Sequence, residues 1–304
     1  MLGSVILAVA AFSLGPLVQT LQIDEPVPPV EQPEVAATAT TPAAVTEFLG
    51  DVMARLYDPR ADGLVSLAFL LPIEDPMMGH TANATVAWTE GSEPTVEVEV
   101  LDFELPPMMA QMGVTLEQVR TSVAPQAQAA GRDFLDRMLG NAIGDMSKGR
   151  VGSMAGVVDG NVVVRFGASS NPMDPFKEHQ LHVDDEGMLR RHIVVAGGPM
   201  GDQRVENQLE WEAAKGGELL VSKGMTMVMD TPMGRLEVQK QTFGYQQVGD
   251  MLLLIEMGTE MKMPGAPMPP VTQTVRGLMV NGQPVSVDAP APAAPATTEP
   301  AVGG

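Results

Sequence analysis

The sequence predicts an α+β protein built on one large, curled antiparallel sheet of about ten to eleven strands. Most of the chain between residues 64 and 287 alternates apolar and polar side chains with a period of two, as in TVEVEV at 95–100. Turn signals such as Asp159-Gly160 separate these segments. Only two stretches show helical spacing instead, so we expect a sheet-dominated body with two helical elements.

The first helical stretch opens the body. Thr41 is a suitable N-cap, and Pro42 suits the first helical position. Apolar side chains then recur at helical spacing as far as Leu56, and the sequence DPRADG at 58–63 ends the pattern. We therefore expect an N-terminal helix with one apolar face.

The second helical stretch runs from Thr115 to about Met146 and follows the segment PPMMAQMG at 106–113. Pro125 lies inside it and is expected to kink it or to divide it into two helices. We expect the helix to cover the sheet as a lid and the preceding segment to form a lip. The residues assigned to lid and lip are Met108, Met109, Met112, Phe134, Leu135 and Met138.

Strands are predicted on both sides of this insertion. Those before it lie at 64–73, 82–90 and 94–104. Those after it comprise two hairpins, centred on 159–160 and 184–187, and five further segments at 204–214, 218–230, 235–246, 251–263 and 272–287. Their alternation is typical of antiparallel strands with one face exposed to water.

The two ends of the chain differ in composition from the body. Residues 1–22 carry no charged side chain and are interpreted as a signal peptide or an uncleaved N-terminal anchor. A third alternative is that the segment has neither of these functions. Residues 23–41 and 289–304 are rich in Pro and Ala and are predicted to be a disordered linker and a disordered tail. A single domain at 42–288 remains, in a protein expected to be periplasmic or secreted.

Composition excludes several classes of function. The formal net charge of −20 argues against nucleic acid and against anionic membrane surfaces as partners. The absence of cysteine excludes disulfides and thiolate catalysis. No nucleophile elbow, phosphate-binding loop or dinucleotide-binding motif occurs in its required context. We therefore expect a monomeric protein that is not an enzyme and uses no cofactor.

Histidine provides no recognisable metal motif. His179 and His192 are expected to face each other across the hairpin around 184–187. Two ligands are too few for a metal site, so we assign none and expect these histidines to respond to pH at most.

Methionine is the unusual residue of this chain, with 23 copies against eight Phe, two Trp and two Tyr. Met225, Met227 and Met229 alternate along one predicted strand. If four-residue loops occupy 231–234 and 247–250, Met227 pairs with Val238 and Met225 pairs with Lys240. The apolar face predicted from this register consists of Met225, Met227, Met229, Leu236, Val238, Ile255, Met257 and Met261.

The same register assigns polar side chains to the opposite face. Glu237, Gln239 and Gln241 alternate with the apolar residues of their strand, and Glu256, Glu260 and Lys262 do so on the next. Because a shift by one residue would exchange the two faces, this sorting supports the predicted sheet.

Three interpretations of the methionine face stay open. It is an ordinary core covered by the helix at 115–146, an adaptable cavity for acyl chains or another apolar segment, or a Cu(I) site made of thioethers. The segments MTMVM and MKMPGAPM resemble methionine-rich copper segments, but alternation along a strand differs from the exposed loops that bind copper.

The order of elements resembles that of periplasmic lipoprotein-carrier proteins and their outer-membrane lipoprotein-sorting relatives. The resemblance rests on the amphipathic helix AAVTEFLGDVMARL, the strand that begins GLVSLAF, the long strands that follow and the final segment TQTVRGLMVNGQPV. Val280-Asn281-Gly282 is its most specific piece. It implies an incomplete β-barrel whose concave apolar side is covered by helices and receives acyl chains. In that family the cavity is rich in aromatic residues, whereas methionine and valine would line this one.

These observations together favour an exported envelope protein that binds a lipid or a lipoprotein acyl chain in a methionine-lined half-barrel. A non-catalytic structural or interaction protein with a filled core is the alternative, and a methionine-rich copper-binding protein is the third.

Overall fold

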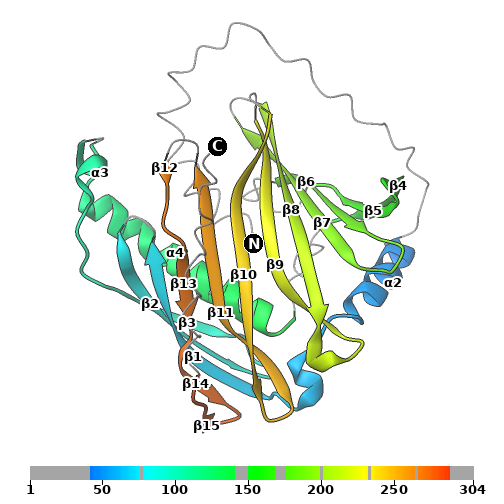
Figure 1. Ribbon diagram of the computed structural model, residues 1–304, viewed down its shortest axis with the longest axis horizontal. Helices are drawn as coiled ribbons and strands as arrows, with labels where there is room; N and C mark the ends of the chain where they lie inside the picture. Colours follow the sequence, from blue (N-terminus) through cyan, green and yellow to red (C-terminus); the bar gives the residue numbers. More distant parts are fainter. Residues whose placement is uncertain are drawn as a thin grey trace, which may run out of the picture.

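The computed structural model describes residues 42–75, 78–111, 113–140, 150–168, 176–198, 201–231, 234–263 and 266–287. The predicted N-terminal segment at 1–22, the linker at 23–41 and the tail at 289–304 lie outside these ranges. Within them, the chain forms two antiparallel sheets with helices packed against them (Figure 1).

The smaller sheet has five strands in the order β15-β14-β1-β2-β3. It combines the first strands of the body with its last ones, so the two ends of the domain lie side by side. Its strands are β1 (Ser66–Asp75), β2 (Gly79–Thr89), β3 (Thr95–Val100), β14 (Arg276–Val280) and β15 (Gln283–Pro284).

The larger sheet has ten strands, in the order β12-β11-β10-β9-β8-β7-β6-β5-β4, with β13 paired to β11. All neighbours along this path are consecutive in sequence, as expected for a chain of hairpins. Its strands are β4 (Gly152–Val158), β5 (Asn161–Phe166), β6 (Phe176–Val183), β7 (Leu189–Gly198), β8 (Gly201–Ala213), β9 (Leu220–Thr231), β10 (Gly234–Val248), β11 (Met251–Met263), β12 (Ala266–Pro267) and β13 (Val271–Thr274).

The prediction of one sheet is wrong, because the last predicted strand at 272–287 breaks at Val275. The residues before Val275 pair with β11 of the larger sheet, and those after it pair with β1 of the smaller sheet. Val275 itself is 1% exposed, and its N–H donates to Ile255 O at 2.9 Å. The chain therefore passes from one sheet to the other at this buried residue.

Helix α4 (Leu116–Met138) begins with a capping box, in which Thr115 Oγ1 accepts from Gln118 N and the Gln118 side chain accepts from Thr115 N. Pro125 lies inside this single helix, so of the two predicted outcomes, a kink or a division into two helices, the division is wrong. Residues 141–149 lie outside the described ranges. A short helix, α3 (Pro107–Gln111), precedes it.

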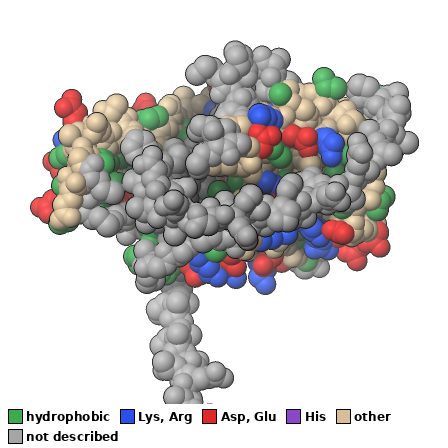
Figure 2. All heavy atoms as spheres, turned by 90° about the horizontal axis from the view of Figure 1, so that it is seen from above, with side chains coloured by type: hydrophobic (Ala, Val, Ile, Leu, Met, Phe, Trp, Pro, Cys, Tyr) green, Lys and Arg blue, Asp and Glu red, His purple; other side chains and the backbone are tan. Residues whose placement is uncertain are grey.

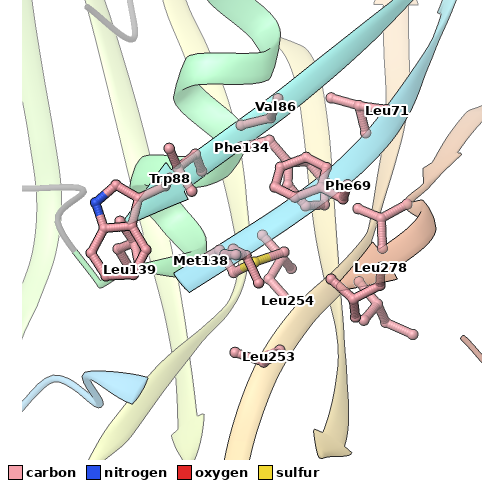
Figure 3. Close-up of a cluster of buried hydrophobic side chains, with 14 of the residues drawn as sticks. Phe69, Leu71, Val86, Trp88, Phe134, Met138, Leu139, Leu253, Leu254 and Leu278 are labelled. Atoms are coloured by element: carbon pink, nitrogen blue, oxygen red, sulfur yellow. The ribbon is translucent and has the colours of Figure 1, made fainter. Parts of the chain in front are cut away.

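Helix α4 packs on the smaller sheet at close range. A Cβ atom on Gly131 would lie only 3.0–3.2 Å from side-chain atoms of Val96, Val86 and Ala84, so the absence of a side chain lets the helix approach these strands. One turn later, Phe134 is fully buried, with its ring centroid 5.6 Å from that of Phe69 on β1. Figure 3 shows Phe134 and Met138 among side chains from both sheets, including Leu253 and Leu254 of β11. Helix α4 therefore fills the space between the smaller sheet and the β11 edge of the larger one.

Helix α2 (Pro42–Met53) covers the other end of the larger sheet. Val45 and Val52 pack in a cluster with Val164, Leu181 and other buried residues of β5 to β7. The helix ends three residues earlier than the predicted Leu56. The segment after it is held to the larger sheet, because Tyr57 OH accepts from Leu252 N at 2.8 Å and donates to Asp62 Oδ2 at 2.7 Å.

The face of β9 to β11 opposite the methionines carries charged side chains, as the alternation indicates. Glu237 and Lys262 form an ion pair there, with 2.9 Å between Oε1 and Nζ. Figure 2 shows acidic and basic side chains intermixed along one flank of the molecule. Exposed pairs of this kind contribute at most about 1 kcal/mol each to stability, so the packing of the other face carries more of the energetics.

Candidate functional site

A single row of paired residues crosses the larger sheet and defines what we call its inner face. Each member is the cross-strand partner of the next, so all share one side of the sheet. From β5 to β11 the row consists of Val164, Leu181, His192, Asn207, Met227, Gln239 and Met261. Because Val164 and Leu181 contact α2, the inner face is the side on which that helix packs.

The methionines of β9 lie on this inner face. Met225 and Met227 are buried, with 4% and 5% of their surface exposed, and Met229 is half-buried opposite Leu236. On β11, Ile255 and Met257 are also buried, whereas Met261 is half-buried. The predicted alternation of methionines therefore coincides with a largely buried surface.

The predicted register of β9 and β10 is correct at the turn and wrong beyond it. Asp230 pairs with Arg235 and Met229 with Leu236, as expected. Val238 is then the extra residue of a β-bulge, so Met227 pairs with Gln239 in place of Val238.

This bulge brings two glutamines to the inner face. Gln239 and Gln241 were assigned by alternation to the opposite, polar face. The structure places them beside Met227 and Met225, and each is only 6% exposed. The register with β11 shifts as well: a two-residue loop replaces the predicted four-residue loop, and Phe243 becomes the partner of Met257.

A cavity of about 60 Å³ lies between the inner face and the ends of both helices. Leu56 and Tyr57 contribute to its wall from the segment after α2, and Arg137 and Met138 contribute from the last turn of α4. The strand residues that line it are mostly apolar or aromatic. They are Leu189, His192, Asn207, Leu209, Trp211, Leu220, Val221, Ser222, Met225, Phe243, Tyr245 and Leu252.

Arg137 is the buried cation of this cavity, with only 7% of its side chain exposed. Its Nε donates to Asp133 Oδ2 at 2.9 Å, one helical turn away. Its Cζ lies 5.0 Å from the ring centroid of Phe243, a cation–π contact. Its Nη2 atom is buried and has no hydrogen-bond partner among the residues that the structure describes.

Among the described residues, several other polar atoms of the cavity wall and of the inner face are also buried without a hydrogen-bond partner. Ser222 Oγ and Asn207 Oδ1 are such atoms on residues that line the cavity, and Gln239 Oε1 and Gln241 Oε1 are such atoms on the same face. A buried polar group without a partner costs about 1–3 kcal/mol. The inner face therefore carries a polar band that the described residues leave unsatisfied.

His192 lies on the same inner face and contacts His179 by a different geometry from the one predicted. The two residues are diagonal neighbours, since His179 pairs with Val194 and Leu181 pairs with His192. Their rings are stacked, with 2.9 Å between His179 Nδ1 and His192 Nε2. Burial and the neighbouring His179 lower the pKa of His192 from 6.5 to about 3. In the described ranges, no group of three or more His, Cys, Asp or Glu side chains is arranged to hold a metal ion.

The residues predicted as lid and lip are separated by the length of α4. Phe134, Leu135 and Met138 lie at the C-terminal end of the helix, where Met138 borders the cavity. Met109 is half-buried in α3, at the other end of a helix that is about 34 Å long. Met109, the lip residue whose side chain the structure describes, therefore does not border this cavity. The side chain of Met108 and all of Met112 lie outside the described part of the chain.

The comparisons with known proteins add no relative to this geometry. No family model, curated protein or solved structure matches the chain. Among the described helices, none has both the length and the apolar character required to cross a bilayer. The case for a function therefore rests on the site itself.

Some residues of the site carried a signal in the sequence, and others did not. Asn207 occupies a position between Val205 and Leu209 at which the alternating segment 204–214 otherwise carries apolar side chains. Its position on the inner face therefore follows from the pattern. Gln239 and Gln241 reach that face only through the bulge at Val238. Arg137 is one of several charged residues within the predicted helix at 115–146, and the sequence carries no signal that singles it out.

Proposed function

We propose that the chain is an exported envelope protein that binds a lipid or a lipoprotein acyl chain on the methionine-lined inner face of an incomplete β-barrel, with α2 and α4 as its cover. In this proposal the protein acts as a monomer, without catalysis. The five- and ten-stranded sheets would together form the open barrel, and the break at Val275 would be the point at which it bends.

The observation that carries the proposal is the cavity at the ends of the two helices. Met138 and Met225 line it, and Met227 lies two residues further along β9 on the same face. Thioether side chains are flexible and adapt to irregular apolar partners. Burial of an alkyl chain against them would contribute about 25 cal/mol for each Å² of apolar surface removed from water.

The size of the cavity constrains how binding would occur. Its volume of about 60 Å³ is well below the roughly 300–1,000 Å³ of typical ligand pockets. An acyl chain would therefore enter only if side chains move. We propose that the methionines and the last turn of α4, which ends at Met138, move to admit it.

One observation favours the alternative of a structural or interaction protein with a filled interior. Met225 and Met257 belong to the same hydrophobic cluster as Phe134 and Met138 of α4. In this alternative the helix itself is the permanent occupant of the methionine face, and the small cavity holds only water.

Native mass spectrometry of the full-length protein, purified without strong detergent, tests the proposal. We expect a population whose mass exceeds that of the chain by one lipid or fatty acid, released on collisional activation. Only the mass of the bare chain, before and after incubation with phospholipid vesicles, would support the filled interior. A mass increase equal to one copper ion after incubation with Cu(I) would support the thioether site instead.

A further inference from the structure

We infer that the ligand is an amphiphile whose head group is a single anionic oxygen acid, a carboxylate or a phosphate, and that Arg137 binds this head group at the cavity. The inference rests on the proposed function, because it specifies the chemical class of the ligand that would occupy the same site.

The first observation is the incomplete pairing of Arg137. A guanidinium group carries five N–H donors, and burying it without acceptors is costly. Asp133 accepts one hydrogen bond from Nε, and Phe243 contributes the face of its ring, but Nη2 has no acceptor. A ligand oxygen at Nη2 would complete the arginine with a charge-assisted hydrogen bond, about twice as strong as a neutral one.

The second observation is the polarity of the atoms around the cavity. Ser222 Oγ is buried without a partner and lines the cavity together with Arg137, so its hydroxyl can donate to a second oxygen of the same head group. Tyr245 OH is already used, because it donates to Ser222 O at 3.0 Å. The two donors without an acceptor, Arg137 Nη2 of α4 and Ser222 Oγ of β9, therefore belong to different elements that line the same cavity.

The third observation is the apolar wall beside these donors. Met138 follows Arg137 directly in α4, and Met225 lies on the same strand as Ser222. With the head group of the ligand at Arg137, the alkyl chain of the ligand would lie next to these methionines. It would continue along the inner face of β9 towards Met227. This arrangement matches an acid with one long chain. A purely hydrocarbon ligand would leave the Nη2 atom of Arg137 buried without an acceptor.

The experiment compares three probes of equal chain length on the full-length protein: dodecanoic acid, dodecyl phosphate and dodecanol. Each displaces a fluorescent alkyl probe that carries no acidic group. The wild-type protein is expected to bind one or both acids at least about tenfold more tightly than the alcohol. The relative affinities of carboxylate and phosphate identify which acid the site accepts.

Arg137→Met is expected to remove this preference, so that the acids bind no more tightly than the alcohol. Arg137→Lys keeps the charge and is expected to retain part of the preference, which separates loss of the head-group contact from loss of folding. Arg132→Met is the matched control. This arginine lies on the same helix with 41% of its side chain exposed. It forms ion pairs at 4.0 Å with Glu93 and Asp136 and donates to Pro94 O at 3.5 Å.

Two results would overturn the inference and leave the proposed function intact: equal affinity of the wild-type protein for acid and alcohol, or an unchanged preference in Arg137→Met. If the wild-type protein binds none of the alkyl probes, the proposed function itself fails and the inference falls with it.

Discussion

Gln239 on β10 lies directly opposite Met227 on β9, and both side chains are at least 94% buried. The pairing exists because Val238 is accommodated as a bulge, which moves the glutamine from the polar face to the inner face. Without the bulge, the apolar Val238 would lie opposite Met227. The inner face is amphiphilic instead, with amide groups next to thioethers.

Replacing Gln239 by methionine is expected to stabilise the protein. The substitution preserves the length of the side chain and removes the buried Oε1 that has no hydrogen-bond partner. We expect the free energy of unfolding to rise by about 1 kcal/mol, measured by urea denaturation. Gln203→Met, at an exposed position of β8, is the control and should change it by less than about 0.5 kcal/mol. A loss of stability in Gln239→Met would show that the amide has a partner in solution.

Gly131 is expected to tolerate no large side chain. A leucine there would press against Val86, Val96 and Ala84, and should reduce the free energy of unfolding by about 2–3 kcal/mol. Gly50→Ala is the matched helical control in α2. No atom lies within 4 Å of the position of its Cβ, so the better helix propensity of alanine should raise stability by about 0.5–1 kcal/mol. Equal effects of the two substitutions on the thermal midpoint would contradict the packing of α4 described above.

Asn281 lies in the turn between β14 and β15 and is expected to anchor this turn to the start of β1. Its Oδ1 accepts from Val65 N and Ser66 N, at 2.9 Å and 3.1 Å, and its Nδ2 donates to Gly63 O at 2.8 Å. Its φ of 52° is left-handed, a conformation that asparagine and glycine tolerate better than alanine. Asn281→Gly should therefore lose about 1–2 kcal/mol of stability, and Asn281→Ala about 1 kcal/mol more. Urea denaturation that ranks alanine equal to glycine would exclude a role for the backbone conformation.

Acid is expected to destabilise the protein through His192. In the folded protein, burial and His179 lower the pKa of His192 from 6.5 to about 3, so the unfolded chain binds more protons between these two values. Stability contributed by this residue is complete above about pH 6.5 and falls towards pH 3, by at most about 1.4 kcal/mol per pH unit. We expect His192→Gln to reduce the slope of stability against pH in this window, as followed by thermal denaturation at several pH values. Parallel curves for variant and wild type would contradict the burial of a neutral His192.

The sequence was sufficient to predict which side chains of β9 share a face, but not the face of β10 residues beyond the bulge or the break between the two sheets. Alternation placed Met225 and Met227 together correctly, because a period of two follows directly from strand geometry. The bulge at Val238 and the break at Val275 change the pairing partner without changing the local pattern, so nothing in the alternation predicts them. The bulge and the break both depend on packing between residues that are far apart in the sequence.

Arg137 illustrates a second limit of sequence-based prediction. On a helical wheel it is a charge four residues from Asp133, which is the pattern of an exposed ion pair. Its burial follows from the contact between the end of α4 and Phe243 of β10, more than 100 residues further along the chain. The helix itself was predicted from its apolar spacing. The most polar part of the candidate site became visible only in three dimensions.

The most direct test of ligand binding at the methionine face is the uptake of a fluorescent fatty acid by the full-length protein and by Met227→Asp. A carboxylate in place of Met227 would place an uncompensated charge on the path of the alkyl chain. Met279→Asp, at an exposed position of β14, is the control. The account predicts saturable uptake by the wild type and by Met279→Asp, and no uptake by a Met227→Asp protein whose circular dichroism spectrum matches the wild type. Unchanged uptake by that folded variant would contradict the account.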